Sequence, residues 1–459
     1  MNAPDPTHAW SPAAPAMAHR DALTGLLNRQ ALLRRLQQRV EQQRAAHAAC
    51  RPADLAVLFL GLDRFGVINH AWGYRGGDEL LQAVAVRLAL AEADGDWTLA
   101  RVGGDEFAIL LPESHGAAAA GGVATDLLQA LAGAFVVRGQ AVHTSACIGV
   151  ALWNPATPSA GDLLRDADIA MHEAKRDGRT AWMLFDGPMR TRLARAAQIE
   201  GALRQAVVGQ QLRAVYQPIV DLDTGEMTSV EALLRWQHPE LGAVSPSEFI
   251  PVAEASGHIT ALGEWILHTS CQQWTAWQRE DAGRAPATIS VNLSREQMSL
   301  GRRVITVVSA ALAAAQMPPQ ALQLEITERE VMKNPEQARE LLLELSAMGV
   351  KLAMDDFGTG TSSLGCLRDF PFHTIKIDKS FVTNVCRDPH VLAVAHATVN
   401  VIENLGMVSV AEGIEDPAEV AALQAMGCRY GQGYLFARPM PGDELLATLL
   451  AGPTRSADF

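Results

Sequence analysis

The 459-residue sequence contains no apolar run long enough to span a membrane, and its start lacks the basic-then-apolar layout of a signal peptide. Six scattered cysteines without paired spacing argue against a disulfide framework or a zinc site, so we expect a cytoplasmic protein. Basic residues are also in deficit, since the formal net charge is −13. This deficit argues against binding to long nucleic acid, where basic groups must replace counterions. It leaves room for a small anionic ligand held by a few local cations or metal ions.

The composition and the length predict a chain of several folded domains. Hydrophobic residues at 48% and charged residues at 19% fit a soluble protein with well-filled cores, and the length predicts two or three domains. We expect a flexible tail over 1–18, an α/β domain over 19–186, a hinge at the start of a linker helix over 187–194, a second domain over 195–450 and a tail over 451–459.

The first half alternates helical and strand-like patterns. The expected elements are helices over 21–40, 76–90, 117–131 and 160–176, and strands over 55–62, 99–111 and 142–152. The run over 99–111 is split into two strands by Gly103 and Gly104, because paired glycines supply the positive φ angles of a tight hairpin. After a breaker at 186–188, the apolar face from Met189 to Val207 predicts a helix. This helix is either a core helix of the second domain or a signalling joint.

The second half repeats a strand-then-helix pattern. Eight strand-like runs end at Tyr216-Gln217, Val230-Glu231, Val291-Asn292, Leu324-Glu325, Met354-Asp355, Ile375-Lys376, Ala411-Glu412 and Gly431-Gln432. About eight strands with intervening helices over roughly 250 residues predict a β/α (TIM-like) barrel. The C-terminal rim of such a barrel carries the chemistry, so the polar groups at these ends should converge on one mouth.

Asp355 and Asp356 are adjacent carboxylates at the end of one of these runs. Neighbouring strand residues point to opposite faces, so both can reach one site only where the strand ends. The simpler interpretation, that Asp-Asp starts a turn, applies to an arbitrary pair. The acidic groups at the other strand ends favour a site.

The strand ends supply an oxygen-rich set without cysteine or histidine. Its members are Glu231, Asn292, Glu325, Asp355, Asp356 and Glu412. Hard oxygen ligands select Mg²⁺ or Mn²⁺, and so many acids suggest two ions bridged by an aspartate. Two ions about 3.5–4 Å apart are the usual arrangement for in-line displacement at phosphorus. Lys376 supplies a cation suited to orienting a water or neutralising charge in the transition state.

Residues 195–450 resemble the EAL family of cyclic di-GMP phosphodiesterases. The matching blocks are Tyr216-Gln217-Pro218-Ile219, Glu231-Ala232-Leu233, Val291-Asn292-Leu293-Ser294, Glu325-Ile326-Thr327-Glu328, Asp355-Asp356-Phe357-Gly358-Thr359-Gly360, Lys376-Ile377-Asp378, Ala411-Glu412-Gly413 and Gly431-Gln432-Gly433-Tyr434. The resemblance implies hydrolysis of cyclic di-GMP to linear pGpG, by a homodimer formed through this domain.

The resemblance also assigns roles. Glu231, Asn292, Glu325 and Asp355 would hold one Mg²⁺ or Mn²⁺ ion, and Asp355, Asp356 and Glu412 the other, with Asp378 acting through water. The catalytic set would be Glu231, Asp355, Lys376 and Glu412, in which Lys376 assists the attacking water. The substrate contacts would be Gln217, Arg235 and Gln432, with Arg235 on a phosphate. Glu328 would support the loop over 358–364, which leads to the dimer interface.

Gly103-Gly104-Asp105-Glu106-Phe107 carries the signature of diguanylate cyclases, and the resemblance covers most of the first domain. Asp21-Ala22-Leu23-Thr24 and Asn28-Arg29 agree with it. By this resemblance the nucleotide is bound by Asn69, Asp78, Gly103, Gly104, Asp105, Glu106, Lys175 and Arg179. The first half is then an α/β domain of the nucleotidyl-cyclase type.

The departures from this family concern its metal site. The family's Asp-x-Asp-x-Phe-Lys stretch is here Gly61-Leu62-Asp63-Arg64-Phe65-Gly66, so one carboxylate ligand and one lysine are lost. Loss of the metal ligand should impair condensation of GTP more than binding of GTP. Tyr74 and Thr180 replace the family's usual His and Asn, and Asp94 and Trp97 occupy the two positions of its Arg-x-x-Asp inhibitory product site, which is absent here.

Three functions compete on this evidence. The favoured one is an active phosphodiesterase with GTP as an allosteric ligand of the first domain. The alternatives are a bifunctional or net diguanylate cyclase, disfavoured by Gly61 and Gly66, and a non-catalytic cyclic di-GMP receptor. The receptor is disfavoured because Glu231, Asp355 and Lys376 are all present.

Overall fold

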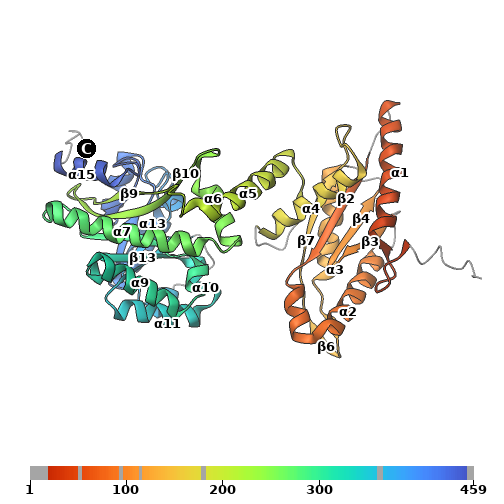
Figure 1. Ribbon diagram of the computed structural model, residues 1–459, viewed down its shortest axis with the longest axis horizontal. Helices are drawn as coiled ribbons and strands as arrows, with labels where there is room; N and C mark the ends of the chain where they lie inside the picture. Colours follow the sequence, from red (N-terminus) through yellow and green to blue (C-terminus); the bar gives the residue numbers. More distant parts are fainter. Residues whose placement is uncertain are drawn as a thin grey trace, which may run out of the picture. The chain divides into compact units, whose positions relative to one another are not determined.

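The computed structural model describes residues 19–49, 54–91, 97–112, 116–176, 182–358 and 365–451. It divides the chain into a first unit, residues 1–195, and a second unit, residues 196–459 (Figure 1). The expected tail over 1–18 lies outside the described residues, as does the expected tail over 451–459 apart from Ala451, which ends the last helix. No helix in the described ranges is both long and apolar enough to cross a membrane. The expectation of two α/β domains, the second a barrel, is confirmed.

The first unit is built on a six-stranded sheet in the order β1-β3-β4-β2-β7-β8. Its strands are β1 (Leu27–Asn28), β2 (Ala56–Leu62), β3 (Thr98–Gly103), β4 (Glu106–Leu111), β7 (Ala146–Leu152) and β8 (Trp182–Leu184), and β5 (Phe135–Val137) pairs with β6 (Gln140–Val142) apart from it. β2 is buried along its whole length, as its continuous apolar sequence predicts.

Two helices cover each face of this sheet. α1 (Arg29–Ala48) and α4 (Ala160–Arg176) share a buried cluster on one face, and α2 (Phe65–Ala91) and α3 (Ala117–Leu131) share the cluster on the other. α4 lies very close to β7 at Gly149. A Cβ atom on this residue would be 1.9 Å from the Ala167 carbonyl oxygen, which is too close for any side chain. Glycine is required there, and it lets the helix reach the neighbouring strand β2.

Two expectations for the first unit were wrong in detail. The helix predicted from residue 21 begins only at Arg29, because Asp21 forms a turn with Thr24 and the Asn28 side chain caps the helix by accepting from Ala31 N. The strand predicted over 142–152 is interrupted at residues 143–145, between β6 and β7.

The second unit is a closed barrel surrounded by helices (Figure 1). Its strands are β9 (Leu212–Asp221), β10 (Met227–His238), β12 (Thr288–Asn292), β13 (Leu322–Thr327), β14 (Lys351–Phe357), β15 (Thr374–Ile377), β16 (Val408–Ala411) and β17 (Tyr430–Gly431), and β11 (Gly242–Val244) forms a hairpin with β10. The pairing of β9 with both β10 and β17 closes the sheet.

The helices of the second unit follow the strands in sequence. They are α6 (Pro246–Ala255), α7 (Ile259–Asp281), α8 (Arg295–Met298), α9 (Arg302–Ala315), α10 (Glu328–Lys333), α11 (Pro335–Ala347), α12 (Gly365–Asp369), α13 (Pro389–Asn404), α14 (Pro417–Ala425) and α15 (Gly442–Ala451), with short 3₁₀ turns at Pro319–Ala321 and Lys379–Phe381. The unit boundary falls within α5 (Gly187–Ala206). Met189 packs with Ile169 of the first unit, whereas Leu203 belongs to a core cluster of the second.

The barrel departs from the expected regular pattern at its first two strands. β9 runs antiparallel to both of its neighbours, and the strands predicted to end at Gln217 and Glu231 continue to Asp221 and His238. Gln217 nevertheless lies beside Glu231, because the two are direct partners in the β9–β10 register. The antiparallel strand β9 therefore places Gln217 at the same level of the barrel as Glu231.

Candidate active site

One lysine of the second unit lies within a ring of four carboxylates. The side chain of Lys376, on β15, is 1% exposed. Its Nζ atom is 2.7 Å from Glu325 Oε2, 2.7 Å from Glu412 Oε1, 3.1 Å from Glu231 Oε2 and 3.4 Å from Asp355 Oδ1. These acids belong to β10, β13, β14 and the residue after β16, so closure of the barrel assembles the ring.

Besides its place on β10, Glu231 accepts hydrogen bonds from Asn292, Gln432 and Lys376. Asn292 Nδ2 donates to its Oε1 at 2.9 Å, and Gln432 Nε2 donates to its Oε2 at 2.8 Å. Gln432 also donates to Gln217 Oε1 at 3.0 Å. Burial alone would raise the pKa of Glu231, but Lys376 and these amides outweigh it and lower the pKa. Glu231 is thus fixed in place as a carboxylate.

Burial and crowding act in the opposite direction on other acids of the ring. Burial raises the pKa of Glu325, and the nearby charges of Glu231 and Asp355 add to this effect. Burial also raises the pKa of Glu412, to about 8. At Lys376 burial favours the neutral form, but the surrounding carboxylates outweigh it and raise the pKa well above its ordinary value. The ring carries more negative charge than one ammonium group can neutralise.

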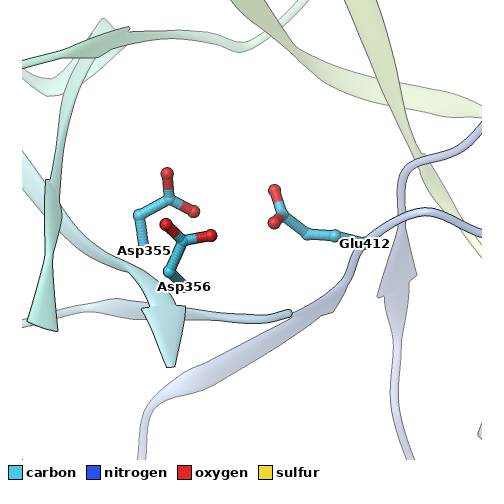
Figure 2. A group of neighbouring side chains, drawn as sticks. All are labelled: Asp355, Asp356 and Glu412. Carbon is cyan, nitrogen blue, oxygen red and sulfur yellow. The ribbon is translucent and has the colours of Figure 1, made fainter. Parts of the chain in front are cut away.

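Asp355 and Asp356 reach the same side of the barrel through a local distortion. The β14–β15 register shifts between Met354 and Phe357, and Asp356 has a φ of 53° in the left-handed region. The bulge turns the second carboxylate toward the first instead of the opposite face. Figure 2 shows both groups on one side of β14, with Glu412 reaching toward them. Ligand oxygen atoms of the three acids lie within 4.8 Å of one another.

The donor set fits divalent cations. Among the residues that the structure describes, Glu325 Oε1 and Asp355 Oδ1 are buried side-chain oxygens that accept no hydrogen bond. Such atoms are rare in folded proteins and call for an ion or a water. Burial raises the pKa of Asp356, and the charges of Asp355 and Asp378 raise it further. An ion bound by these oxygens would relieve both the missing contacts and the repulsion.

The other residues predicted for this site lie around the ring. Arg235 is on β10, two strand repeats beyond Glu231, and its Nη1 donates to Leu234 O at 2.9 Å. Asp378 follows β15 and accepts from Ser380 N at 2.9 Å. Glu328 is 2% exposed, and its Oε2 accepts from Gly358 N at 3.0 Å. The rest of the loop that Glu328 was predicted to support, residues 359–364, lies outside the described residues.

A buried polar layer directly beneath the site was missed by the sequence analysis. Gln323 Nε2 donates to Ser290 Oγ at 3.0 Å, and Thr374 Oγ1 donates to Gln323 Oε1 at 3.0 Å. Each of the three residues comes two positions before a site residue on its own strand, namely Asn292, Glu325 and Lys376. Strand alternation could have revealed the layer, because residues two apart share a face.

In the first unit, the predicted hairpin is present between β3 and β4. Gly104 has a φ of 49°, whereas Gly103 has no positive φ, so one glycine and not both supplies the special conformation. Arg101 closes the turn, since its Nη2 donates to Gly104 O at 2.7 Å. Its Nη1 lies 3.1 Å from Asp21 Oδ1, an ion pair with both side chains largely buried. The hairpin that bears Asp105 is therefore tied to the turn at Asp21.

Asn69 and Asp78, two of the predicted nucleotide contacts, lie on either side of a kink in α2. Gly73, with φ 68° and ψ 170°, breaks this helix between Asn69 and Asp78. A Cβ atom on Gly77 would lie 2.0 Å from Asn69 Oδ1, so Asn69 lies directly over the residue before Asp78. Arg179, Thr180 and Asp94, all considered in the sequence analysis, lie outside the described residues.

The metal site expected from the cyclase resemblance does not fit the first unit. Gly61 is the direct partner of Glu106 across β2 and β4, yet it brings no carboxylate. Lys175 Nζ lies over it and donates to Leu62 O at 3.2 Å. A positively charged group therefore lies beside Glu106, where the family would place a metal ligand.

Two family models match the chain. The model described as "EAL domain" covers residues 200–439, and the model described as "Diguanylate cyclase, GGDEF domain" covers residues 18–181. A bifunctional diguanylate cyclase/cyclic di-GMP phosphodiesterase of Pseudomonas aeruginosa, MucR, is 39% identical over 433 residues, which are 94% of this chain and 62% of MucR. The cyclic di-GMP phosphodiesterase NbdA of the same organism is 36% identical over 428 residues, 93% of this chain and 53% of NbdA.

A solved structure gives the same result for the second unit. The PaMucR phosphodiesterase in complex with c-di-GMP matches with a TM-score of 0.52 and 40% identity, over 54% of this chain and 99% of that chain. The chain spans only about half to two thirds of the length of MucR and NbdA. The EAL model alone covers more than half of the chain, behind a matched GGDEF domain. The chain belongs to the EAL domain family, in the tandem GGDEF–EAL arrangement.

Proposed function

We propose that the second unit hydrolyses cyclic di-GMP to linear pGpG. The observation that carries this proposal is the ring of four carboxylates around the buried Lys376, with two of its oxygens lacking a hydrogen bond. The names of MucR and NbdA and the c-di-GMP complex of the MucR phosphodiesterase supply the substrate. A receptor without catalysis would have no need for so much unneutralised charge in one place.

Two Mg²⁺ or Mn²⁺ ions would occupy the site. The first would be held by Glu231, Asn292, Glu325 and Asp355, and the second by Asp355, Asp356 and Glu412, with Asp378 acting through water. Bound there, such ions act as Lewis acids on phosphate oxygens and lower the pKa of water. Only oxygen donors are present, which favours these hard ions over zinc or copper.

The reaction breaks one P–O3′ bond of the cyclic dinucleotide. The oxygen of a water forms a new bond to phosphorus, its proton passes to a carboxylate of the ring, and the released ribose 3′ oxygen takes up a proton. Lys376, held among the carboxylates of the ring, would act as a hydrogen-bond donor that orients the water and offsets the charge that develops at phosphorus. Asn292 and Gln432 keep Glu231 oriented during this step.

The remaining residues would position substrate and loop. Gln217 and Gln432 face each other across β9 and β17 and would contact the nucleotide near Glu231. Arg235, half-buried on β10, would bind a phosphate. Glu328 would act at a distance from the substrate, by fixing Gly358 where the loop over 359–364 begins.

The test is Glu231→Gln in purified full-length protein. This change keeps the shape of the side chain but removes a charge, so hydrolysis of cyclic di-GMP should fall by about a hundredfold or more. Chelation by EDTA should abolish activity in the unaltered protein, and Mg²⁺ or Mn²⁺ should restore it. Glu240→Gln, at an exposed position between β10 and β11, is the matched control. Equal turnover by Glu231→Gln and by the unaltered protein would refute the proposed site.

We also propose that the first unit binds GTP as a regulator of this hydrolase and has little cyclase activity. Asn69, Asp78 and the hairpin are retained, while the carboxylate at position 61 is absent. GTP should change the rate of cyclic di-GMP hydrolysis, and no cyclic di-GMP should form from GTP. An unchanged rate across a GTP titration would contradict the regulatory role. Assembly as a homodimer through the second unit, in the cytoplasm, completes the proposal.

A further inference from the structure

The side chain of Lys175, on α4, lies over Gly61 of the first unit. Gly61 lies on β2 with Glu106 of β4 as its direct partner. A Cβ atom on Gly61 would lie 2.6 Å from Lys175 Nζ and 3.0 Å from Met171 Sδ, both on α4. The ammonium group therefore lies where a side chain on residue 61 would begin.

The ammonium lies in acidic surroundings. Lys175 Nζ donates to Leu62 O at 3.2 Å, and a lysine has three N–H donors, so one bond leaves donors for a ligand. Burial raises the pKa of Glu106, and the charges of Asp168 and Asp105 raise it further, while His172 and Lys175 oppose them. Lys175 and His172 therefore bring positive charge to a place where three carboxylates lie near one another.

The position of this lysine is set by the fold. α4 can approach the sheet only because of Gly149, whose Cβ would collide with the Ala167 carbonyl oxygen at 1.9 Å. Two helical turns further along α4, Lys175 reaches over β2. The packing of α4 thus brings the Lys175 side chain within reach of β2.

A divalent cation is a poor fit at this place. In the part of the chain that the structure describes, the acidic, histidine and cysteine side chains near enough to hold a metal are Asp355, Asp356 and Glu412, all in the second unit. In the first unit, a cation entering beside Gly61 would meet the charge of Lys175 at short range. The residues present therefore do not fit the metal that the cyclase resemblance implies.

We propose that the first unit binds the triphosphate of GTP through the ammonium of Lys175 and without a divalent cation. This inference rests on the proposed GTP binding and adds how the phosphates are neutralised. A metal-assisted site holds the nucleotide through carboxylates and an ion, whereas this site would offer an ammonium group that contacts phosphate oxygens directly.

The test is isothermal titration calorimetry of the full-length protein with GTP, once in EDTA and once in Mg²⁺. We expect the two dissociation constants to agree within about threefold. Lys175→Met should weaken binding in EDTA by about tenfold or more, because a charge-assisted contact is lost. Arg176→Met, which removes the adjacent and exposed charge on α4, is the matched control and should bind GTP as the unaltered protein does.

A second variant restores the carboxylate. Gly61→Asp would meet only the flexible end of Lys175 and the Met171 sulfur, so the fold should tolerate it, which a melting curve checks. The new carboxylate should capture the ammonium and weaken GTP binding in EDTA by about tenfold. Added Mg²⁺ should recover part of that loss.

The outcomes distinguish this inference from the proposal on which it rests, that the first unit binds GTP. Binding of GTP to the unaltered protein only when Mg²⁺ is present would overturn the inference and leave GTP binding intact. Equal binding by Lys175→Met and the unaltered protein would also overturn it. Absence of GTP binding in both buffers would overturn GTP regulation as well, while hydrolysis by the second unit would be unaffected.

Discussion

Lys376 in the second unit and Lys175 in the first both place an ammonium group among carboxylates, but in different environments. Lys376 is fully buried and lies within 3.4 Å of four carboxylates. Lys175 is partly exposed on α4, and the hydrogen bond of its Nζ goes to the main-chain oxygen of Leu62. The number of acids around each lysine separates the two sites.

This difference has a chemical consequence. Around Lys376 the acids outnumber the cation and leave two buried oxygens without a hydrogen bond, so the site calls for further positive charge. At Lys175 one acid has been replaced by glycine, and the lysine fills the space that this leaves. An excess of carboxylates suits metal-assisted chemistry, whereas an ammonium group whose hydrogen bond goes to a main-chain oxygen keeps other N–H donors for an anion.

The largest expected effect comes from Lys376→Met. Loss of the ammonium should lower hydrolysis of cyclic di-GMP by roughly a hundredfold to a thousandfold, because the attacking water and the phosphorus lose a charged donor. The variant should also be less stable by about 3–5 kcal/mol without metal, since buried carboxylates lose their partner.

Initial rates and chemical denaturation in EDTA and in Mn²⁺ would measure both effects. Lys333→Met, an exposed lysine at the end of α10, is the control for loss of a lysine. If Lys376→Met kept its rate, the ring would be a structural ion-pair network, and the contrast with Lys175 would lose its catalytic meaning.

An intermediate effect is expected for the polar layer beneath the ring. Gln323→Leu leaves Ser290 and Thr374 without their buried partner, so the free energy of unfolding should fall by about 1–3 kcal/mol. The same change should lower kcat by roughly tenfold with little change in KM, because β13 and β15 carry Glu325 and Lys376.

The double variant Gln323→Leu, Thr374→Val provides the control for this layer. Removing both partners of a hydrogen bond is less costly than removing one, so the double variant should recover part of the stability. Recovery of stability without recovery of kcat would identify Gln323 as a positioning residue. If kcat did not change in either variant, the layer would serve packing alone.

The smallest effect concerns the hairpin of the first unit. Arg101→Gln removes the ion pair to Asp21 and weakens the bonds to Gly104 O, so the first unit should lose about 1–2 kcal/mol of stability. GTP affinity should fall by only about threefold, because Arg101 supports the hairpin that bears Asp105 and does not face the Lys175 ammonium. Calorimetry against Arg34→Gln, an exposed position on α1, would check it. A larger loss than that of Lys175→Met would contradict the role given to Lys175.

Much of the architecture could be predicted because local patterns were strong. The continuous apolar run of β2 and the helical spacing of α3 and α4 gave elements close to those observed. The failures arise from contacts that apolar patterns do not encode. The turn at Asp21 depends on bonds to Thr24 and Arg101, and apolar spacing does not detect them. The reversal of β9 is set by its pairing with β10 and β17, which strand propensity does not encode.

The identity of the acidic groups was fixed by the sequence itself, since carboxylates at successive strand ends must meet at one mouth when parallel strands close into a barrel. Their arrangement was decided by the tertiary structure. The left-handed φ of Asp356 turns two adjacent aspartates to one side, and the approach of α4 over Gly149 places Lys175 above Gly61. Both depend on contacts between segments far apart in the chain, and such contacts arise only when the elements pack.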